Sequence, residues 1–175
     1  MIAAFRAAKF ENVILDVYSS FKIYGWEDKD KDWEPLYDAC KDTPNVNYHG
    51  SVPNEEIRTA LQQTHILAYP CTYKETACIS AIEAMSAGCV VVCPNLAVLP
   101  ETCANFAWMY GYCEDKAEHT RKFAYVLKDA IDNFWEAPVQ AGLAFQKQYF
   151  DMHYDLSLIH ISEPTRRTPI SYAVF

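Results

Sequence analysis

The chain has 175 residues, of which 51% are hydrophobic and 14% aromatic, and its formal net charge is −8. This composition predicts a globular protein with a real core and excludes an intrinsically disordered chain. The negative charge argues against nucleic acid or an anionic membrane as a partner, because both repel an acidic surface. The sequence has neither an apolar run of membrane-spanning length nor a signal peptide, so we expect no export.

The seven cysteines point to a reducing compartment. Several fall in segments that are predicted to be buried, and no pair has the Cys-x-x-Cys spacing of a metal or redox site. We therefore expect free thiols, no metal and a cytoplasmic protein. Any contact with the inner face of the membrane would be made by a part of the protein that this chain lacks.

The first forty residues predict helices around one strand. Apolar residues are spaced in a loosely helical way over residues 1–17. Residues 20–24 alternate between apolar and polar, which predicts a strand ending at Gly25. The charged residues 26–32 should be exposed, and residues 33–41 should form a helix.

The next forty residues predict a strand, a helix and a second strand. Residues 46–49 predict a strand closed by Gly50, and Pro53 opens an amphipathic helix. Residues 65–69 form an apolar run that ends at Pro70, which predicts a buried strand followed by a turn.

Residues 73–88 contain the helix around which the rest of the chain is organised. Thr76 is the expected N-cap and Gly88 the expected C-terminal stop of this helix. Its predicted apolar face carries Cys78, Ile82 and Met85. The apolar residues 89–93 follow at once and predict another buried strand.

The remaining segments complete the alternation of strands and helices. We expect a loop or short helical turn at residues 97–103, a strand at 106–110, a long helix at 115–135 and a last helix at 138–155 that packs back on the domain. Strands and helices that alternate at these lengths predict an α/β, Rossmann-like fold, with a parallel sheet covered by helices on both faces.

Two glutamates flank the start of the central helix. The free N–H groups of the first helical turn and the helix dipole favour a phosphate or diphosphate. Those N–H groups are expected to belong to Ala77, Cys78 and Ile79. Glu83 lies seven residues beyond Thr76, about 10 Å along the helix axis, where its carboxylate can accept two hydroxyls of a ribose. Glu75 precedes the helix and could accept hydroxyls of a second group, so the series matches a nucleotide sugar. Alone, this spacing also occurs by chance, with Glu83 a solvated helix residue and Glu75 an ordinary loop acid.

The flanking sequence favours the nucleotide-sugar interpretation. The whole segment resembles the donor-binding half of glycosyltransferases of the two-Rossmann-domain (GT-B) type, family 4, over roughly residues 12–155. The matching motifs are Glu75 with Glu83-Ala84-Met85 and Ala87-Gly88, Asn47 to Val52, Leu99-Pro-Glu101, Ile23 to Trp26, and Glu75 to Ile79. The last two motifs are typical of bacterial and phage-like members.

The resemblance implies a role for each part of the site. The loop from Gly50 to Val52 would contact the nucleobase, Glu83 the ribose, Thr76 to Ile79 the diphosphate, and Glu75 the donor sugar. Open α/β sheets bind ligands beyond the carboxyl ends of their strands, so Gly25, Gly50 and residues 70–75 should line one crevice. Plain turn chemistry explains the two glycines equally well.

The resemblance also implies a hexosyltransferase that retains anomeric configuration without a metal, a cofactor or a covalent intermediate. Its partners would be a nucleotide sugar and an acceptor glycan, lipid or protein. The alternatives are a nucleotide-sugar 2-epimerase and a non-catalytic domain that binds nucleotide sugars or acts as a scaffold.

Parts of the family pattern are absent. We expect residues 1–155 to be a donor-binding domain that lacks its first strand and the basic residues near that strand. The acceptor-binding N-terminal domain is expected to be missing as well. Lys74 is a weak substitute for the missing basic residues, and Arg6 and Lys9 are not assigned that role. We therefore expect the chain to be inactive alone. Residues 156–175 resemble a translated sequencing-library adapter and are excluded from the fold.

Overall fold

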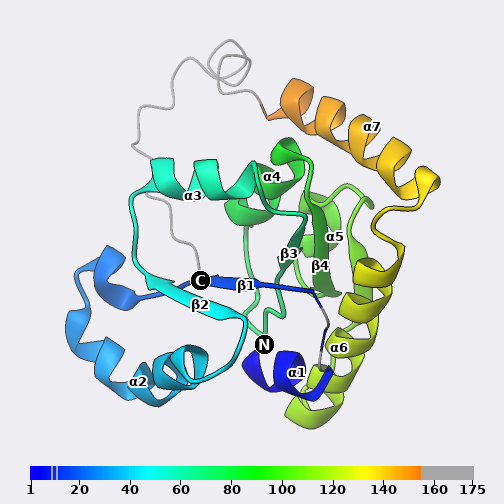
Figure 1. The fold of residues 1–175 in the computed structure, drawn as a ribbon. Helices are drawn as coiled ribbons and strands as arrows, with labels where there is room; N and C mark the ends of the chain where they lie inside the picture. Colours follow the sequence, from blue (N-terminus) through cyan, green and yellow to red (C-terminus); the bar gives the residue numbers. More distant parts are fainter. Residues whose placement is uncertain (9, 11, 155–175) are drawn as a thin grey trace, which may run out of the picture.

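The computed structural model describes residues 1–8, 10 and 12–154, and the expected non-native tail lies outside this range. Helices and strands alternate along the chain (Figure 1). In chain order they are α1 (Ile2–Ala8), β1 (Leu15–Tyr18), the 3₁₀ helix η1 (Phe21–Tyr24), α2 (Glu27–Lys41), β2 (Val46–Gly50), α3 (Asn54–Leu61), β3 (Ile66–Ala68), α4 (Ile79–Ala87), β4 (Val90–Asn95), α5 (Leu99–Thr102), β5 (Trp108–Gly111), α6 (Lys116–Asn133) and α7 (Ala137–His153). The predicted α/β class is confirmed. No helix in the described part of the chain is both long and apolar enough to cross a membrane.

The strands form two parallel sheets instead of the single sheet that we expected. β1 pairs with β2, while β3, β4 and β5 form the second sheet with β4 in the centre. β1 and β3 are therefore edge strands within the described part of the chain. The sequence of strands, β2-β1 and then β3-β4-β5, matches a doubly wound sheet of order 3-2-1-4-5-6 without its strand 1.

Helices cover both faces of the β3–β4–β5 sheet, as predicted. Val90 and Val92 point into a core made mainly with α6, whereas Val91 and Cys93 point into a core made with α4, α5 and α7. All four residues are at most 2% exposed. Successive strand residues face opposite sides of a sheet, so this run of apolar residues contributes side chains to the core on each face.

The last helix holds the carboxyl end of α4 in place. Gly88 stops α4 with a φ of +91°, and its N–H donates to the carbonyls of Ala84 and Met85. The buried side chain of Gln146 on α7 donates from Nε2 to the carbonyl oxygens of Cys89 at 2.9 Å and Met85 at 3.3 Å. These bonds tie α7 to the end of α4.

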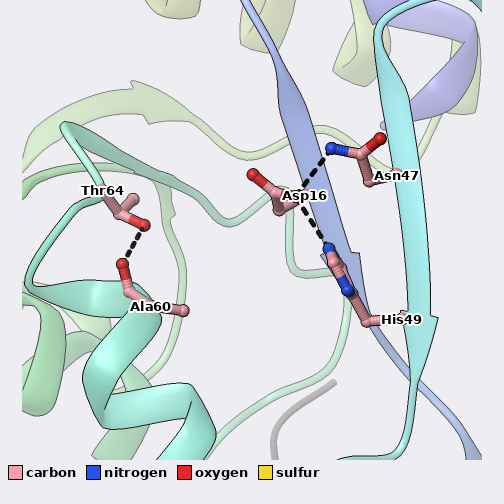
Figure 2. Close-up of polar contacts among 5 residues, drawn as sticks. All are labelled: Asp16, Asn47, His49, Ala60 and Thr64. Carbon is pink, nitrogen blue, oxygen red and sulfur yellow. Dashed lines mark hydrogen bonds and ion pairs between the residues drawn. The ribbon is translucent and has the colours of Figure 1, made fainter.

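The β1–β2 sheet has a smaller core and an exposed polar cluster. Its core is formed by Phe5 with Cys40 and Val46. On the sheet, Asp16 accepts hydrogen bonds from Asn47 at 3.1 Å and contacts His49 Nε2 at 2.7 Å (Figure 2). His49 thus pairs across the two strands, which agrees with its expected place at a strand end.

A side chain just beyond α3 adds a bond to the last turn of the helix. The Thr64 hydroxyl donates to the Ala60 carbonyl at 2.8 Å (Figure 2). The same carbonyl also accepts the backbone N–H of Gln63 at 3.0 Å. The chain then enters β3 directly.

The N-terminal third differs from the prediction in two places. Residues 1–17 contain both α1 and β1, because Leu15 and Val17 pack on the β1–β2 core. Residues 20–24 form no strand: Phe21–Tyr24 are the 3₁₀ helix η1, and Ser20 is its N-cap. The carboxylate of Asp30 accepts bonds from the Phe21 N–H and the Ser20 hydroxyl, both at 2.8 Å, and these bonds close the turn.

The charged segment before residue 33 belongs to α2, which starts at Glu27 and includes Pro35. Residues 26–29, 31 and 32 are exposed as predicted, whereas Asp30 is half-buried. Pro35 lies inside the helix, where it removes one backbone hydrogen bond, and the helix continues through it.

Candidate functional site

Glu83 lies on the side of α4 that faces α3. Its side chain is 17% exposed, and its Oε1 lies 3.4 Å from Nε of Arg58 on α3. Arg58 is 51% exposed, so this ion pair is long and partly solvated. The carboxylate is therefore sheltered but accessible, as a ligand for hydroxyl groups must be.

The helix that carries Glu83 starts later than predicted. α4 begins at Ile79 with Cys78 as its N-cap residue, so Thr76 is not the N-cap, and Thr76 and Ala77 precede the helix. The backbone N–H groups of the first turn therefore belong to Cys78, Ile79 and Ser80. Glu83 is the fifth helical residue, about 6 Å along the axis from the first.

The buried face of α4 also differs from the expected one. Cys78 and Met85 are buried as predicted, but Ile82 is half-buried. The helix packs instead through Ala81 and Ala84, which are both 0% exposed. Small side chains at these positions let α4 lie close to β4, so packing sets the face of the helix.

Glu75 lies in the loop between β3 and α4, and a tyrosine hydroxyl fixes it. The hydroxyl of Tyr69 donates to Oε1 of Glu75 at 2.6 Å. The thiol of Cys71 makes a longer contact of 3.9 Å with the same oxygen. Burial raises the pKa of Tyr69, and the neighbouring Cys78 and Glu75 raise it further, so the phenol remains a donor at neutral pH.

Two thiols belong to this segment, the half-buried one of Cys71 and the buried one of Cys78. Burial raises the pKa of Cys78 to about 11, with the Glu75 carboxylate contributing, and burial also raises the pKa of Cys71. Both thiols are therefore neutral at physiological pH and add no negative charge to the segment before α4. The described residues contain no group of three or more His, Cys, Asp or Glu side chains that could hold a metal ion.

The two glutamates lie before and within α4, and each has a different partner. Glu75 precedes the helix and Glu83 lies just beyond its first turn. Among the described residues, no hydrogen bond or ion pair joins their side chains.

The expected nucleobase loop is connected to Glu83 through α3. Gly50 ends β2 with a φ of +68°, and Val52 is half-buried in the loop before α3. α3 packs against α4 and presents Arg58 to Glu83. The loop and the carboxylate thus flank the same helix.

Gly25 and Lys74 are less well connected to the site. Gly25 caps η1 instead of following a strand, and its N–H donates to the Lys22 carbonyl at 2.9 Å. Turn chemistry accounts for this glycine. Lys74 is exposed beside Glu75. The binding roles of both residues remain predictions.

Of the two basic residues near the N-terminus, Arg6 has other partners and Lys9 is not among the described residues. Arg6 donates to the Thr43 hydroxyl at 2.7 Å and to the Ala39 carbonyl at 2.9 Å, so it holds α1 against α2. Lys9 lies outside the described residues. These bonds agree with leaving Arg6 out of the phosphate site.

Sequence reasoning missed Tyr69 and Arg58. Tyr69 could have been noticed as a polar-tipped aromatic residue at the end of a buried strand, immediately before a proline turn. Arg58 gave no such signal, because its partner lies on another helix, 25 residues away.

Comparison with known proteins identifies the family. The family described as "Glycosyl transferases group 1" matches residues 3–140. The O-antigen chain mannosyltransferase B of Escherichia coli is 31% identical over 126 residues. The aligned part is 71% of this chain but only 31% of that relative. Because the family match covers more than half of the chain, the protein belongs to the group 1 glycosyltransferases.

Proposed function

We propose that this chain is the donor-binding domain of a glycosyltransferase that takes its sugar from a nucleotide sugar. The observation that carries the proposal is that Glu75, held by Tyr69, lies in the loop before α4, while Glu83, paired with Arg58, lies on the helix itself. Along the chain, a carboxylate thus comes before and after the N–H groups of the first helical turn, which would suit the order of sugar, diphosphate and ribose in such a donor.

Each group would have one task in binding. The N–H groups of Cys78, Ile79 and Ser80 would hold the diphosphate, assisted by the helix dipole. Glu83 would accept the ribose hydroxyls, which would either replace Arg58 on this carboxylate or bind next to it. Glu75 would accept hydroxyls of the sugar. Stabilising the departing diphosphate and orienting the donor would drive transfer with retention, without a metal or a covalent intermediate.

Residues 1–155 would form this domain, with the acceptor-binding domain outside the chain. The chain's 31% coverage of its Escherichia coli relative supports this division. The sheet order also supports a missing strand between β1 and β3, two of the edge strands, since that strand would complete the order of a doubly wound sheet. The acceptor is a glycan, lipid or protein, and transfer would take place in the cytoplasm.

The name of the relative suggests which donor to test first. It is a mannosyltransferase, so the first ligands are GDP-mannose and GDP, followed by UDP-glucose and UDP-N-acetylglucosamine with UDP. Isothermal titration calorimetry measures the affinity of each sugar nucleotide and of its free nucleoside diphosphate. If none of these ligands binds to the chain, the proposal is contradicted.

The two glutamates should separate by role. Glu83→Gln should weaken both the sugar nucleotide and the free diphosphate, because both contain the ribose. Glu75→Gln should weaken only the sugar nucleotide. Losing one hydrogen bond to a charged group costs about 1.5–3 kcal/mol, or about 10- to 150-fold in affinity. Glu136→Gln, at an exposed residue before α7, is the matched control. Equal losses for both ligands in both variants would refute the assignment.

A further inference from the structure

Tyr69 connects the core of the domain to the carboxylate of Glu75. It follows β3 directly, and its N–H donates to the Val92 carbonyl at 2.9 Å, so its backbone continues the sheet. Its side chain is 8% exposed and packs in the same core as Cys78 and Met85. Only its hydroxyl reaches the loop, where it donates to Oε1 of Glu75 at 2.6 Å.

This bond restricts the Glu75 side chain. A glutamate in a loop has three rotatable side-chain bonds, and ordering such a chain on binding costs about 0.5–1.5 kcal/mol. A donor fixed by β-sheet bonding and core packing removes much of that freedom in advance. The length of the bond is typical of a hydroxyl that donates to a carboxylate, which is among the stronger protein hydrogen bonds.

The bond leaves acceptor capacity for a ligand. A carboxylate has about four lone-pair positions. The Tyr69 hydroxyl takes one, and the distant Cys71 thiol contributes a weak contact to the same oxygen. The second oxygen of Glu75 is thereby held in one orientation while other acceptor positions stay open.

We propose that Tyr69 is a positioning residue that orients the Glu75 carboxylate toward the sugar hydroxyls of the donor. The inference rests on the proposed function, because it takes Glu75 as the sugar-binding carboxylate. Tyr69 would act only through Glu75 and would not touch the nucleotide. Removing its hydroxyl should therefore affect sugar nucleotides and spare free nucleoside diphosphates.

Tyr69→Phe tests the proposal, and Tyr110→Phe is its matched control. Tyr110 is also buried, at 5% exposure, and lies near the carboxyl end of β5, but its hydroxyl contacts His119 Nε2 at 3.1 Å. Calorimetry on the 175-residue chain with GDP-mannose should show about a 2- to 12-fold loss of affinity in Tyr69→Phe and none in Tyr110→Phe. GDP should bind equally to both variants. In the background of Glu75→Gln, Tyr69→Phe should cause no further loss.

A second measurement separates this proposal from the proposed function. With ¹³C-labelled glutamate, the Glu75 carboxyl resonance is assigned by its disappearance in Glu75→Gln. That resonance should shift in Tyr69→Phe and stay in place in Tyr110→Phe. If no nucleotide sugar of the panel binds the wild-type chain, the proposed function fails, and this resonance alone decides whether Tyr69 positions the carboxylate. An unchanged resonance, or equal losses of GDP-mannose and GDP affinity, would overturn the inference.

Discussion

Replacing Gln146 with leucine should loosen the attachment of α7 to the end of α4. Gln146 is 2% exposed, and its amide donates to the Cys89 carbonyl at 2.9 Å and to the Met85 carbonyl at 3.3 Å. Leucine has a similar size and no donor. The change therefore removes both bonds while leaving the apolar packing of the helix largely intact.

The expected loss follows from the state of the two acceptors. The Met85 carbonyl also accepts the Gly88 N–H at 3.1 Å, so it keeps a partner and its lost bond counts for little. Depriving the buried Cys89 carbonyl of the shorter bond is the main cost, since a buried group left without a partner costs about 1–3 kcal/mol. We therefore expect a loss of about 2 kcal/mol in the free energy of unfolding, which lowers the Tm by about 4–8 °C in a domain of this size.

Urea unfolding followed by circular dichroism at 222 nm measures this loss. Gln148→Leu is the control, because Gln148 lies on the same helix but is exposed. It changes helix propensity and hydrophobicity in the same way without removing the buried amide. If the two variants unfold within 0.5 kcal/mol of each other, the bonds from Gln146 do not hold α7 to α4.

Three further outcomes are expected. Deleting residues 156–175 should leave the Tm unchanged in a thermal melt, and a marked drop would show that this tail packs on the domain. The chain alone should show no turnover with radiolabelled nucleotide sugars and glycan or lipid acceptors, because an acceptor held against the donor supplies about 7–11 kcal/mol of barrier lowering; turnover above a Glu75→Ala, Glu83→Ala control would refute this. At pH 8, iodoacetamide should label the half-buried Cys113 and spare Cys78 and Cys89, whose pKa values burial raises to about 11 and about 12, so that both remain neutral thiols. Mass spectrometry that finds either buried thiol labelled in the native protein would contradict this burial.

The carboxyl-terminal two-thirds of the fold could be predicted because its signals are local. Apolar runs such as residues 89–93 give buried strands, and a glycine such as Gly88 ends a helix wherever the chain must turn left-handed. α6 begins after Asp115 as expected, since that carboxylate accepts the Glu118 N–H at 2.7 Å. Each of these features depends on neighbours in the sequence.

The errors come from contacts between distant residues. Thr76 has the chemistry of an N-cap, yet burial of Cys78 and the bond between Tyr69 and Glu75 set the path of the loop, so α4 starts two residues later. Residues 20–24 alternate as a strand does, but Asp30 binds the Phe21 N–H and closes a turn. Tertiary bonds of this kind override local preference.

The division of the apolar interior into separate cores has a consequence for hydrogen exchange. The β1–β2 sheet depends on the small core around Phe5 and Val46, while α1 links it to the larger core of α6 through the neighbouring Ala4. Amide protons of β2 should therefore exchange through a partial opening that leaves β4 closed. The loop from Gly50 to Val52 belongs to the part that opens. A nucleotide bound to both this loop and α4 would couple the two parts, and β2 would gain protection that neither core provides alone.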